Sequence, residues 1–252
     1  MALTDGTSEE RLDQERGDLE RAAAGVARGE THGRGVHFEP DGRRSVGYRL
    51  ARLLFTAIVG LWFRPMVSGR EHVPRNGPVI LAPVHRSFAD FGFNAFLTRR
   101  KLFFMAKDEL WRSRFLGWLL VSLGAFPVHR ESADREALRH AEEVLRRGQV
   151  LVLFPEGTRQ QGYEVAPLLE GAAFLSARTG APIVPVGIGN SDLAMPKGRL
   201  VPKPLRIRLV VGPPVAPPER SGGGRVARSR VHATTEELRQ RIQEVYDQAR
   251  AG

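Results

Sequence analysis

The sequence predicts an α/β fold in which helices flank a mostly parallel central sheet, with an amphipathic helix on the N-terminal side. Short runs rich in Val, Ile, Leu and Phe recur along the chain, and helical segments lie between several of them. Short runs that are apolar throughout are typical of strands buried on both faces, and their alternation with helices favours parallel pairing. We predict strands at 79–83, 102–105, 126–128, 150–154, 183–188 and 205–211.

The N-terminal part of the chain divides into two segments. Residues 1–45 are polar and rich in Gly, Glu and Arg, so we expect a mobile leader with a short helix at 8–24. Residues 46–65 have apolar side chains at helical spacing and arginines at both ends, which predicts an amphipathic helix over 46–64. Its longest apolar run, 53–63, is 11 residues long. A bilayer span needs about 20, so we expect no spanning helix.

Two helices are predicted inside the body of the chain. The first covers 133–147, because Ser132 is a favourable N-cap and Gly148 follows the last periodic residue. The second covers 168–179 and stops at Gly180. With the predicted strands, these helices define a body over 66–212.

The C-terminal segment, 213–252, begins as a linker rich in Pro, Gly and Arg. A last helix is predicted over 236–250, because Thr234 and Glu237 have the spacing of a capping box.

The chain is strongly basic. It has 38 Lys and Arg against 28 Asp and Glu, a net charge of +10, and only four of the cations are lysines. Residues 1–45 hold ten of the acids and seven of the arginines, so the rest of the chain carries 31 cations and 18 acids, a net +13. This excess indicates a polyanionic partner: nucleic acid, an anionic membrane surface or a phosphorylated substrate. The absence of Cys excludes disulfides, thiolate metal sites and a cysteine nucleophile.

A histidine and an aspartate lie five positions apart directly after a predicted strand. Asp90, in the first turn of the next helix, can reach back to one ring nitrogen of His85 and leave the other nitrogen free as a general base. The alternative is a histidine that caps the end of the sheet. His129 and Asp134 have the same spacing, so the spacing alone does not choose between the two pairs.

The second motif is the Phe-Pro-Glu-Gly-Thr-Arg segment at 154–159. It follows a strand-like run, and ligands bind in the loops after the carboxyl ends of parallel strands. Its turn offers a carboxylate, a hydroxyl and a guanidinium, and Arg159 has the fork that binds a phosphate through two hydrogen bonds. The alternative is a surface turn with an ordinary ion pair.

Taken together, these segments resemble the glycerolipid acyltransferase family, the relatives of 1-acylglycerol-3-phosphate acyltransferase. The resemblance covers about 66–212 and places His129 at an ordinary position inside the second block. Val84 is a departure, because the family usually has Asn before the histidine. Four blocks match in the order of the family: His85–Asp90, Gly124–Arg130, Phe154–Arg159 and Val184–Gly187.

The resemblance implies transfer of a fatty acyl group from acyl-CoA or acyl carrier protein to the hydroxyl of a lysophosphatidic acid-like acceptor, with no further cofactor and no metal. His85 would be the general base, Asp90 would orient it, and Ser87 would be a loop hydroxyl rather than a nucleophile. Pro185 would line the acyl or acceptor pocket. The residues implied to hold the acceptor phosphate are Lys107, Arg130, Glu156, Gly157, Thr158 and Arg159.

Substrates of this kind imply a cytoplasmic enzyme that works peripherally on the inner face of the cell membrane. Segments 46–64 and 111–120 combine Trp, apolar side chains and Arg, so each is either an interfacial helix or a helix packed on the core. Nucleic acid is not expected as a partner, because no helix-turn-helix, RRM or zinc pattern is present. Two alternatives stay open: a glycerol-3-phosphate, lysophospholipid or glycolipid acceptor, and a non-catalytic lipid-binding relative.

Overall fold

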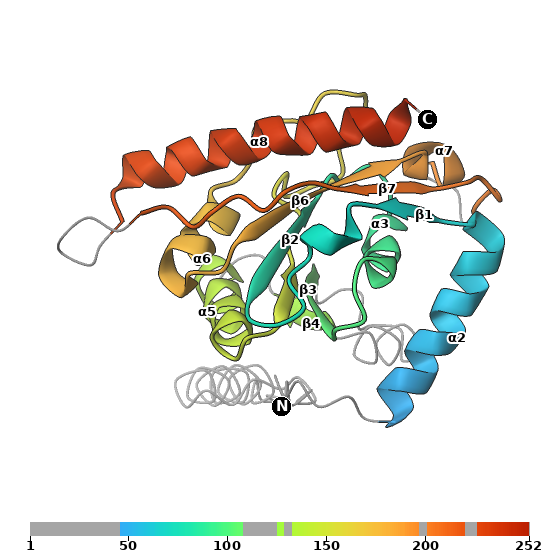
Figure 1. Cartoon of the computed structure of the whole chain (residues 1–252), viewed down its shortest axis with the longest axis horizontal. Helices are drawn as coiled ribbons and strands as arrows, with labels where there is room; N and C mark the ends of the chain where they lie inside the picture. Colours follow the sequence, from blue (N-terminus) through green and yellow to red (C-terminus); the bar gives the residue numbers. More distant parts are fainter. Residues whose placement is uncertain (1–45, 108–124, 129–132, 197–200, 220–225, 252) are drawn as a thin grey trace, which may run out of the picture. The chain divides into compact units, whose positions relative to one another are not determined.

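The computed structural model describes residues 46–107, 125–128, 133–196, 201–219 and 226–251 (Figure 1). These residues belong to one compact unit, 40–252. The predicted leader at 1–45, the segment 111–120, His129 and the predicted N-cap Ser132 lie outside the described residues.

The strands of the described residues form one seven-stranded sheet in the order β1-β7-β6-β2-β5-β3-β4. The five strands from β6 to β4 run parallel, whereas β7 is antiparallel to β6 and carries β1 parallel to itself. The predicted α/β fold with a mostly parallel sheet is therefore confirmed. The strands are β1 (Met66–Ser68), β2 (Val79–Pro83), β3 (Leu102–Lys107), β4 (Ala125–Val128), β5 (Val150–Val152), β6 (Ile183–Gly189) and β7 (Arg208–Val211).

Helices cover both faces of this sheet. Figure 1 shows α5, α6 and α8 on one side, and α2 and α3 on the other. The helices are α2 (Val46–Phe63), α3 (Asp90–Phe93), α5 (Ala133–Arg146), α6 (Gly171–Thr179), α7 (Ser191–Ala194) and α8 (Arg228–Arg250), with the 3₁₀ turns η1 (Arg70–His72) and η2 (Asn94–Phe96).

The sheet differs from the prediction at its margins. Strand β1 was not predicted, because it has only three residues and pairs with β7 alone at the edge of the sheet. The predicted strand 205–211 is shortened to β7, and the run 150–154 leaves the sheet after Val152. Beyond Val152 the chain enters the loop that carries the second motif.

The start of α8 corrects the C-terminal prediction. The helix begins at Arg228 rather than near residue 236, so the predicted capping box at Thr234 and Glu237 is wrong. Thr234 and Thr235 are buried inside the helix, where the Thr235 hydroxyl donates a hydrogen bond to the Val231 carbonyl at 2.9 Å. Burial of these small polar residues inside a helix is not visible in a capping pattern. Helix α6 likewise begins three residues later than predicted, at Gly171.

Helix α2 ends within one residue of its prediction and has two different faces. Phe63 is buried and meets Phe93 of α3 edge to face, with 5.2 Å between ring centroids. The opposite face is solvent-exposed and apolar, and we call it the α2 stripe. None of the described helices is both long and apolar enough to cross a bilayer. The α2 stripe consists of Leu50, Leu53, Leu54, Ile58, Leu61 and Trp62, each at least 46% exposed.

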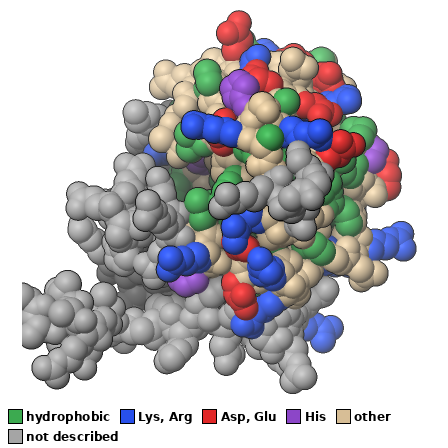
Figure 2. Space-filling view, turned by 90° about the vertical axis from the view of Figure 1, so that its left-hand side faces the viewer, with side chains coloured by type: hydrophobic (Ala, Val, Ile, Leu, Met, Phe, Trp, Pro, Cys, Tyr) green, Lys and Arg blue, Asp and Glu red, His purple; other side chains and the backbone are tan. Residues whose placement is uncertain are grey.

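Ion pairs connect neighbouring helices on the outer surface. Figure 2, which views the molecule from the left of Figure 1, shows acidic and basic side chains intermixed on that face. Arg178 of α6 donates to Glu142 of α5 with an N–O distance of 2.8 Å. This hydrogen bond is the main reason that the pKa of Glu142 lies below its ordinary value. Arg146 of α5 also pairs with Glu142, so this carboxylate is shared by two arginines.

Helix α8 packs directly on β6, and glycine allows the close approach. A Cβ atom on Gly187 would lie 2.2 Å from the Val245 carbonyl oxygen, and one on Gly189 would lie 2.2 Å from that of Ala249. Because these contacts are with backbone atoms, a rotamer change cannot relieve them. The C-terminal segment is thus part of the same packed unit as the sheet.

We predict that Gly187→Ala lowers the free energy of unfolding by about 1–3 kcal/mol or more, because α8 must move away from β6. Gly171→Ala at the start of α6 is the control, since no heavy atom lies within 4 Å of its added Cβ. That change should leave stability unaltered or raise it by up to about 1 kcal/mol. Urea denaturation measures both. Equal effects of the two substitutions would contradict the close packing of α8.

Candidate active site

The candidate site lies where the connections of two neighbouring strands diverge. Strands β2 and β5 are adjacent, but β2 leads to β3 on one side and β5 leads to β6 on the other. In a parallel sheet, such a reversal opens a crevice outside the carboxyl ends of the two strands. The loop after β2 carries His85, and the loop after β5 carries Glu156. The topology thus brings the two sequence motifs to one place.

The predicted His–Asp pair is in hydrogen-bond contact. Nδ1 of His85 lies 3.1 Å from Oδ2 of Asp90, which is the first residue of α3 and fully buried. The same oxygen accepts the backbone N–H groups of Arg86 and Ser87, both at 2.6 Å. Three donors on one carboxylate oxygen hold the side chain of Asp90 in a single orientation.

The imidazole of His85 has one used and one available nitrogen. Its ring stacks on Phe154, with centroids 4.2 Å apart and an interplanar angle of 30°. The bond to Asp90 occupies Nδ1 and favours the tautomer that has its proton there, so the lone pair is on Nε2. Nε2 has no partner among the described residues, and the side chain is 20% exposed. A proton donor from solution can therefore reach it.

A buried ion pair connects the two loops. Nη1 of Arg86 lies 2.9 Å from each carboxylate oxygen of Glu156, and neither side chain is more than 1% exposed. Glu156 Oε2 also accepts the backbone N–H of His85 at 2.8 Å. The backbone of His85 and the side chain of Arg86 are thus both fixed to the loop after β5.

Arg86 uses its remaining donors to hold the rest of the second loop. Its Nη2 donates to the Glu164 carbonyl at 2.9 Å, and its Nε donates to the Gly162 carbonyl at 3.2 Å. The guanidinium also lies 5.0 Å from the ring centroid of Tyr246 in α8. Sequence reasoning missed this residue, although an arginine directly beside the histidine, with a glutamate in the other motif, is the signal that could have found it.

The turn of the second motif is exposed beside the dyad. Gly157 has a φ of 71°, and a Cβ atom there would lie 2.7 Å from Cδ1 of Leu169, so only glycine fits without strain. Thr158 accepts a hydrogen bond from the Gln160 side chain at 3.1 Å. The exposed guanidinium of Arg159 has no partner among the described residues. It is available to an anion that enters the crevice.

Glu156 and Pro185, which the sequence analysis places at the substrate, are both surrounded by other parts of the protein. Both carboxylate oxygens of Glu156 are already bonded inside the protein, and their charge would repel a phosphate. We therefore assign Glu156 to holding the loops rather than to contact with the acceptor. Pro185 is buried inside β6 and registers with Ala82 of β2. Its predicted contact with the acyl or acceptor group stays a prediction.

The remaining predicted residues are only partly covered by the structure. Lys107 is the last residue of β3, but its side chain is outside the description, and Arg130 lies outside the described residues. Ser87 is buried, and its hydroxyl donates to the Met195 carbonyl at 3.1 Å, which confirms that it is a loop hydroxyl.

Comparison with known proteins points to one family. The acyltransferase family model matches residues 64–189. The 1-acyl-sn-glycerol-3-phosphate acyltransferase of Bacillus subtilis is 26% identical over 199 residues, which cover 79% of this chain and 96% of the relative. The corresponding enzyme of Streptococcus pneumoniae is 36% identical over 146 residues, 54% of each chain. The crystal structure of the 1-acyl-sn-glycerophosphate (LPA) acyltransferase of Thermotoga maritima is similar to this chain, with a TM-score of 0.62 and 26% sequence identity. The match covers 80% of this chain and 78% of the chain in the crystal structure.

We predict that Arg86→Ala lowers the free energy of unfolding by about 3–5 kcal/mol, because it leaves the carboxylate of Glu156 buried without a partner. In the double variant Arg86→Met/Glu156→Leu, the loss of unfolding free energy should be smaller than the sum of the losses in the single variants Arg86→Met and Glu156→Leu. The exposed pair Arg230–Glu219 is the control, and Arg230→Ala should cost less than about 1 kcal/mol. A loss for Arg86→Ala no larger than that of the control would contradict the anchoring role.

Proposed function

The chain belongs to the acyltransferase family and is an O-acyltransferase, and from this premise we propose that it acylates a lysophosphatidic acid-like acceptor in phospholipid synthesis. The acyl donor is a thioester, either acyl-CoA or acyl carrier protein. The observation that carries the proposal is the His85–Asp90 pair after β2, in which Nε2 is partly exposed and has no partner among the described residues.

In the proposed reaction, His85 is the general base. Nε2 takes the proton of the acceptor hydroxyl while the hydroxyl oxygen attacks the thioester carbonyl, so the new C–O bond forms as the proton leaves. Collapse of the tetrahedral intermediate breaks the C–S bond, and the imidazolium returns the proton to the leaving thiolate. Asp90, held by three donors, stabilises the imidazolium and keeps its orientation. No acyl-enzyme is formed on this route.

Arg159 is the residue that we assign to the acceptor phosphate. Its guanidinium is exposed, has no partner among the described residues and follows the exposed turn at Gly157 and Thr158. An arginine fork binds two phosphate oxygens at once and so fixes the acceptor relative to the base. Arg130 and Lys107 stay predicted members of the same phosphate site.

The α2 stripe supports a working position at a membrane surface. Six apolar side chains are exposed on one face of a helix whose other face packs on the protein. Helices of this kind lie in the plane of the lipid interface, with the apolar face inserted and without crossing the bilayer. A peripheral position on the inner face of the cell membrane would bring both lipid-like substrates to the crevice.

We predict that His85→Ala lowers the turnover number by at least about 10²–10⁴-fold, because the hydroxyl then has no positioned base. An assay with radiolabelled acyl-CoA and lysophosphatidic acid measures the turnover, and circular dichroism checks the fold. His232→Ala is the control, since that histidine is exposed on α8 and pairs with Glu170 of the α6 N-cap. A folded His85→Ala protein with normal turnover would eliminate the mechanism and favour a non-catalytic lipid-binding role for the site.

We predict that Arg159→Ala raises KM for a phosphorylated acceptor about tenfold or more, with a smaller effect on kcat, because a charged hydrogen bond of about 1.5–3 kcal/mol is lost. Arg139→Ala, an exposed arginine on α5, is the control. A panel of glycerol-3-phosphate, lysophospholipid and glycolipid acceptors tests the alternatives. If the substitution raises KM equally for an acceptor without a phosphate, the assignment of Arg159 is wrong.

A further inference from the structure

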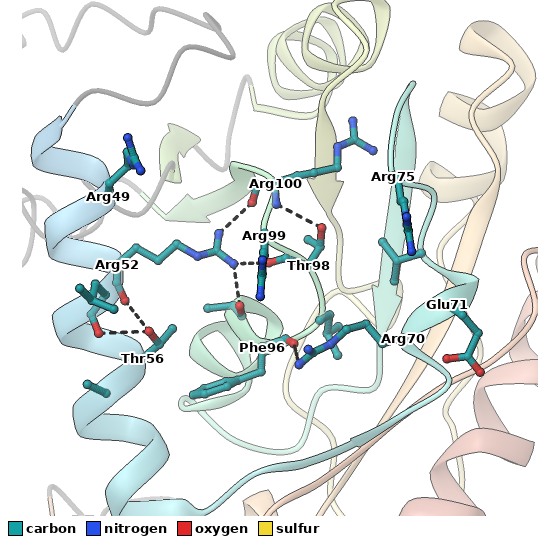
Figure 3. Close-up of a pocket in the computed structure, with 15 residues that line it drawn as sticks. Arg49, Arg52, Thr56, Arg70, Glu71, Arg75, Phe96, Thr98, Arg99 and Arg100 are labelled. Carbon is teal, nitrogen blue, oxygen red and sulfur yellow. Dashed lines mark hydrogen bonds between the residues drawn. The ribbon is translucent and has the colours of Figure 1, made fainter.

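An open groove lies beside the N-terminal half of α2, at the amino end of β2 (Figure 3). Its volume is about 1240 Å³, and its walls come from α2, η1 and the segment 95–100. Arg75 in this wall precedes β2, whereas His85 follows it. Five strand residues at about 3.3 Å each separate the two ends by about 17 Å. The groove is therefore a different place from the candidate active site.

Three of the arginines in the groove build its wall. Arg52 donates to the carbonyls of Arg100 and Ala95 at 2.8 and 2.6 Å and to that of Thr98. Arg70 donates to the Phe96 carbonyl, and Arg100 donates to the carbonyls of Pro74 and Gly148, which precede β2 and β5. These bonds connect α2 and η1 to the segment after η2 and make the groove a defined structure rather than a gap between loops.

Three further arginines have no ion-pair partner in the part of the chain that the structure describes. Arg49, Arg75 and Arg99 are exposed at the groove, and none has a hydrogen bond or ion pair among the described residues. Figure 3 shows their side chains on different walls of the groove. Glu71 is the one acid among the lining residues, so six arginines against one glutamate leave a net charge of +5.

This charge contrasts with the intermixed surface of Figure 2 and indicates an anionic ligand. Guanidinium groups on several walls match the oxygens of a phosphate, which arginine binds through its planar fork. Leu53 and Ala57 of α2 line the groove as well, and Leu53 belongs to the α2 stripe. A phosphate that carries acyl chains could therefore place its head in the groove and its chains along α2.

We propose that this groove, which we call the arginine groove, binds the phosphate headgroup of an anionic bilayer phospholipid at a site separate from the acceptor site. The inference rests on the proposed working position at a membrane surface, but it does not depend on the catalytic role of the dyad. Binding there would fix α2 on anionic lipid and orient the protein on the bilayer.

The test is flotation of the full chain with vesicles of phosphatidylcholine, with and without phosphatidylglycerol, over a salt series. The groove variant is Arg75→Gln/Arg99→Gln, in which neither substitution removes a described bond. The matched control is Arg139→Gln/Arg228→Gln, which removes the same charge from exposed arginines outside the groove. A third variant, Leu54→Glu/Ile58→Glu, removes apolar contact from the α2 stripe.

The groove variant should lose affinity for phosphatidylglycerol vesicles about 30-fold, because each arginine near the surface contributes about 1 kcal/mol. The control should lose less than about threefold. The α2 variant should lose binding to both kinds of vesicle. Equal losses in the groove and control variants would overturn the proposal, since only general charge would then matter. Wild-type protein that binds neither vesicle would overturn both the groove proposal and the membrane position.

Two further measurements complete the test. The first distinguishes a lipid phosphate from free phosphate, and the second distinguishes the arginine groove from the active site. Inorganic phosphate at concentrations similar to the lipid should not displace the protein from vesicles, and efficient displacement would show a free-phosphate site instead. Turnover on a short-chain acceptor in solution should be unchanged in the groove variant, whereas His85→Ala should lose turnover and retain vesicle binding. Loss of that turnover in the groove variant would show that the groove belongs to the active site.

Discussion

The buried ion pair between Arg86 and Glu156 is the constraint on which the site depends. It joins the loops after two adjacent parallel strands whose connections diverge to opposite sides. A buried pair of this kind gains little net stability, but it strongly penalises any arrangement that separates its partners. The same carboxylate binds the backbone of His85, and the same guanidinium meets Tyr246 of α8. One interaction therefore fixes the first loop, the second loop and the C-terminal helix to one another.

The geometry of the dyad follows from this constraint. With the backbone at His85 and Arg86 fixed, two N–H groups and the imidazole converge on one oxygen of Asp90. A base that is already oriented does not have to be ordered during the reaction, which is how positioning contributes to catalysis. The arginine groove lies at the amino end of β2, and the α2 stripe extends from beside it toward Phe63, which contacts Phe93 of α3. In the proposed position at a membrane, α2 would therefore connect the groove with the helix that carries Asp90.

The sequence predicted the features that depend on local pattern. Strands such as β2 and β6 are apolar throughout, and the spacing of His85 and Asp90 placed both residues correctly after a strand. Features that depend on distant partners escaped prediction. Strand β1 pairs with β7 alone among the described strands, and the first turn of α8 packs through Val231 on Ala173 and Ala177 of α6. Glu156 is 70 residues from Arg86, so its internal role could not be read from its own motif.

The central claim is that His85 is held with its proton on Nδ1 and its lone pair on Nε2. Nitrogen-15 NMR of histidine-labelled protein, with the His85 signals identified by comparison with a His85→Ala sample, measures this tautomer directly. In the neutral form of the imidazole we expect the proton on Nδ1 and none on Nε2, and we expect Asp90→Ala to lose this preference. A neutral His85 with its proton on Nε2 would contradict this arrangement, because Nε2 could then accept no proton from the acceptor hydroxyl.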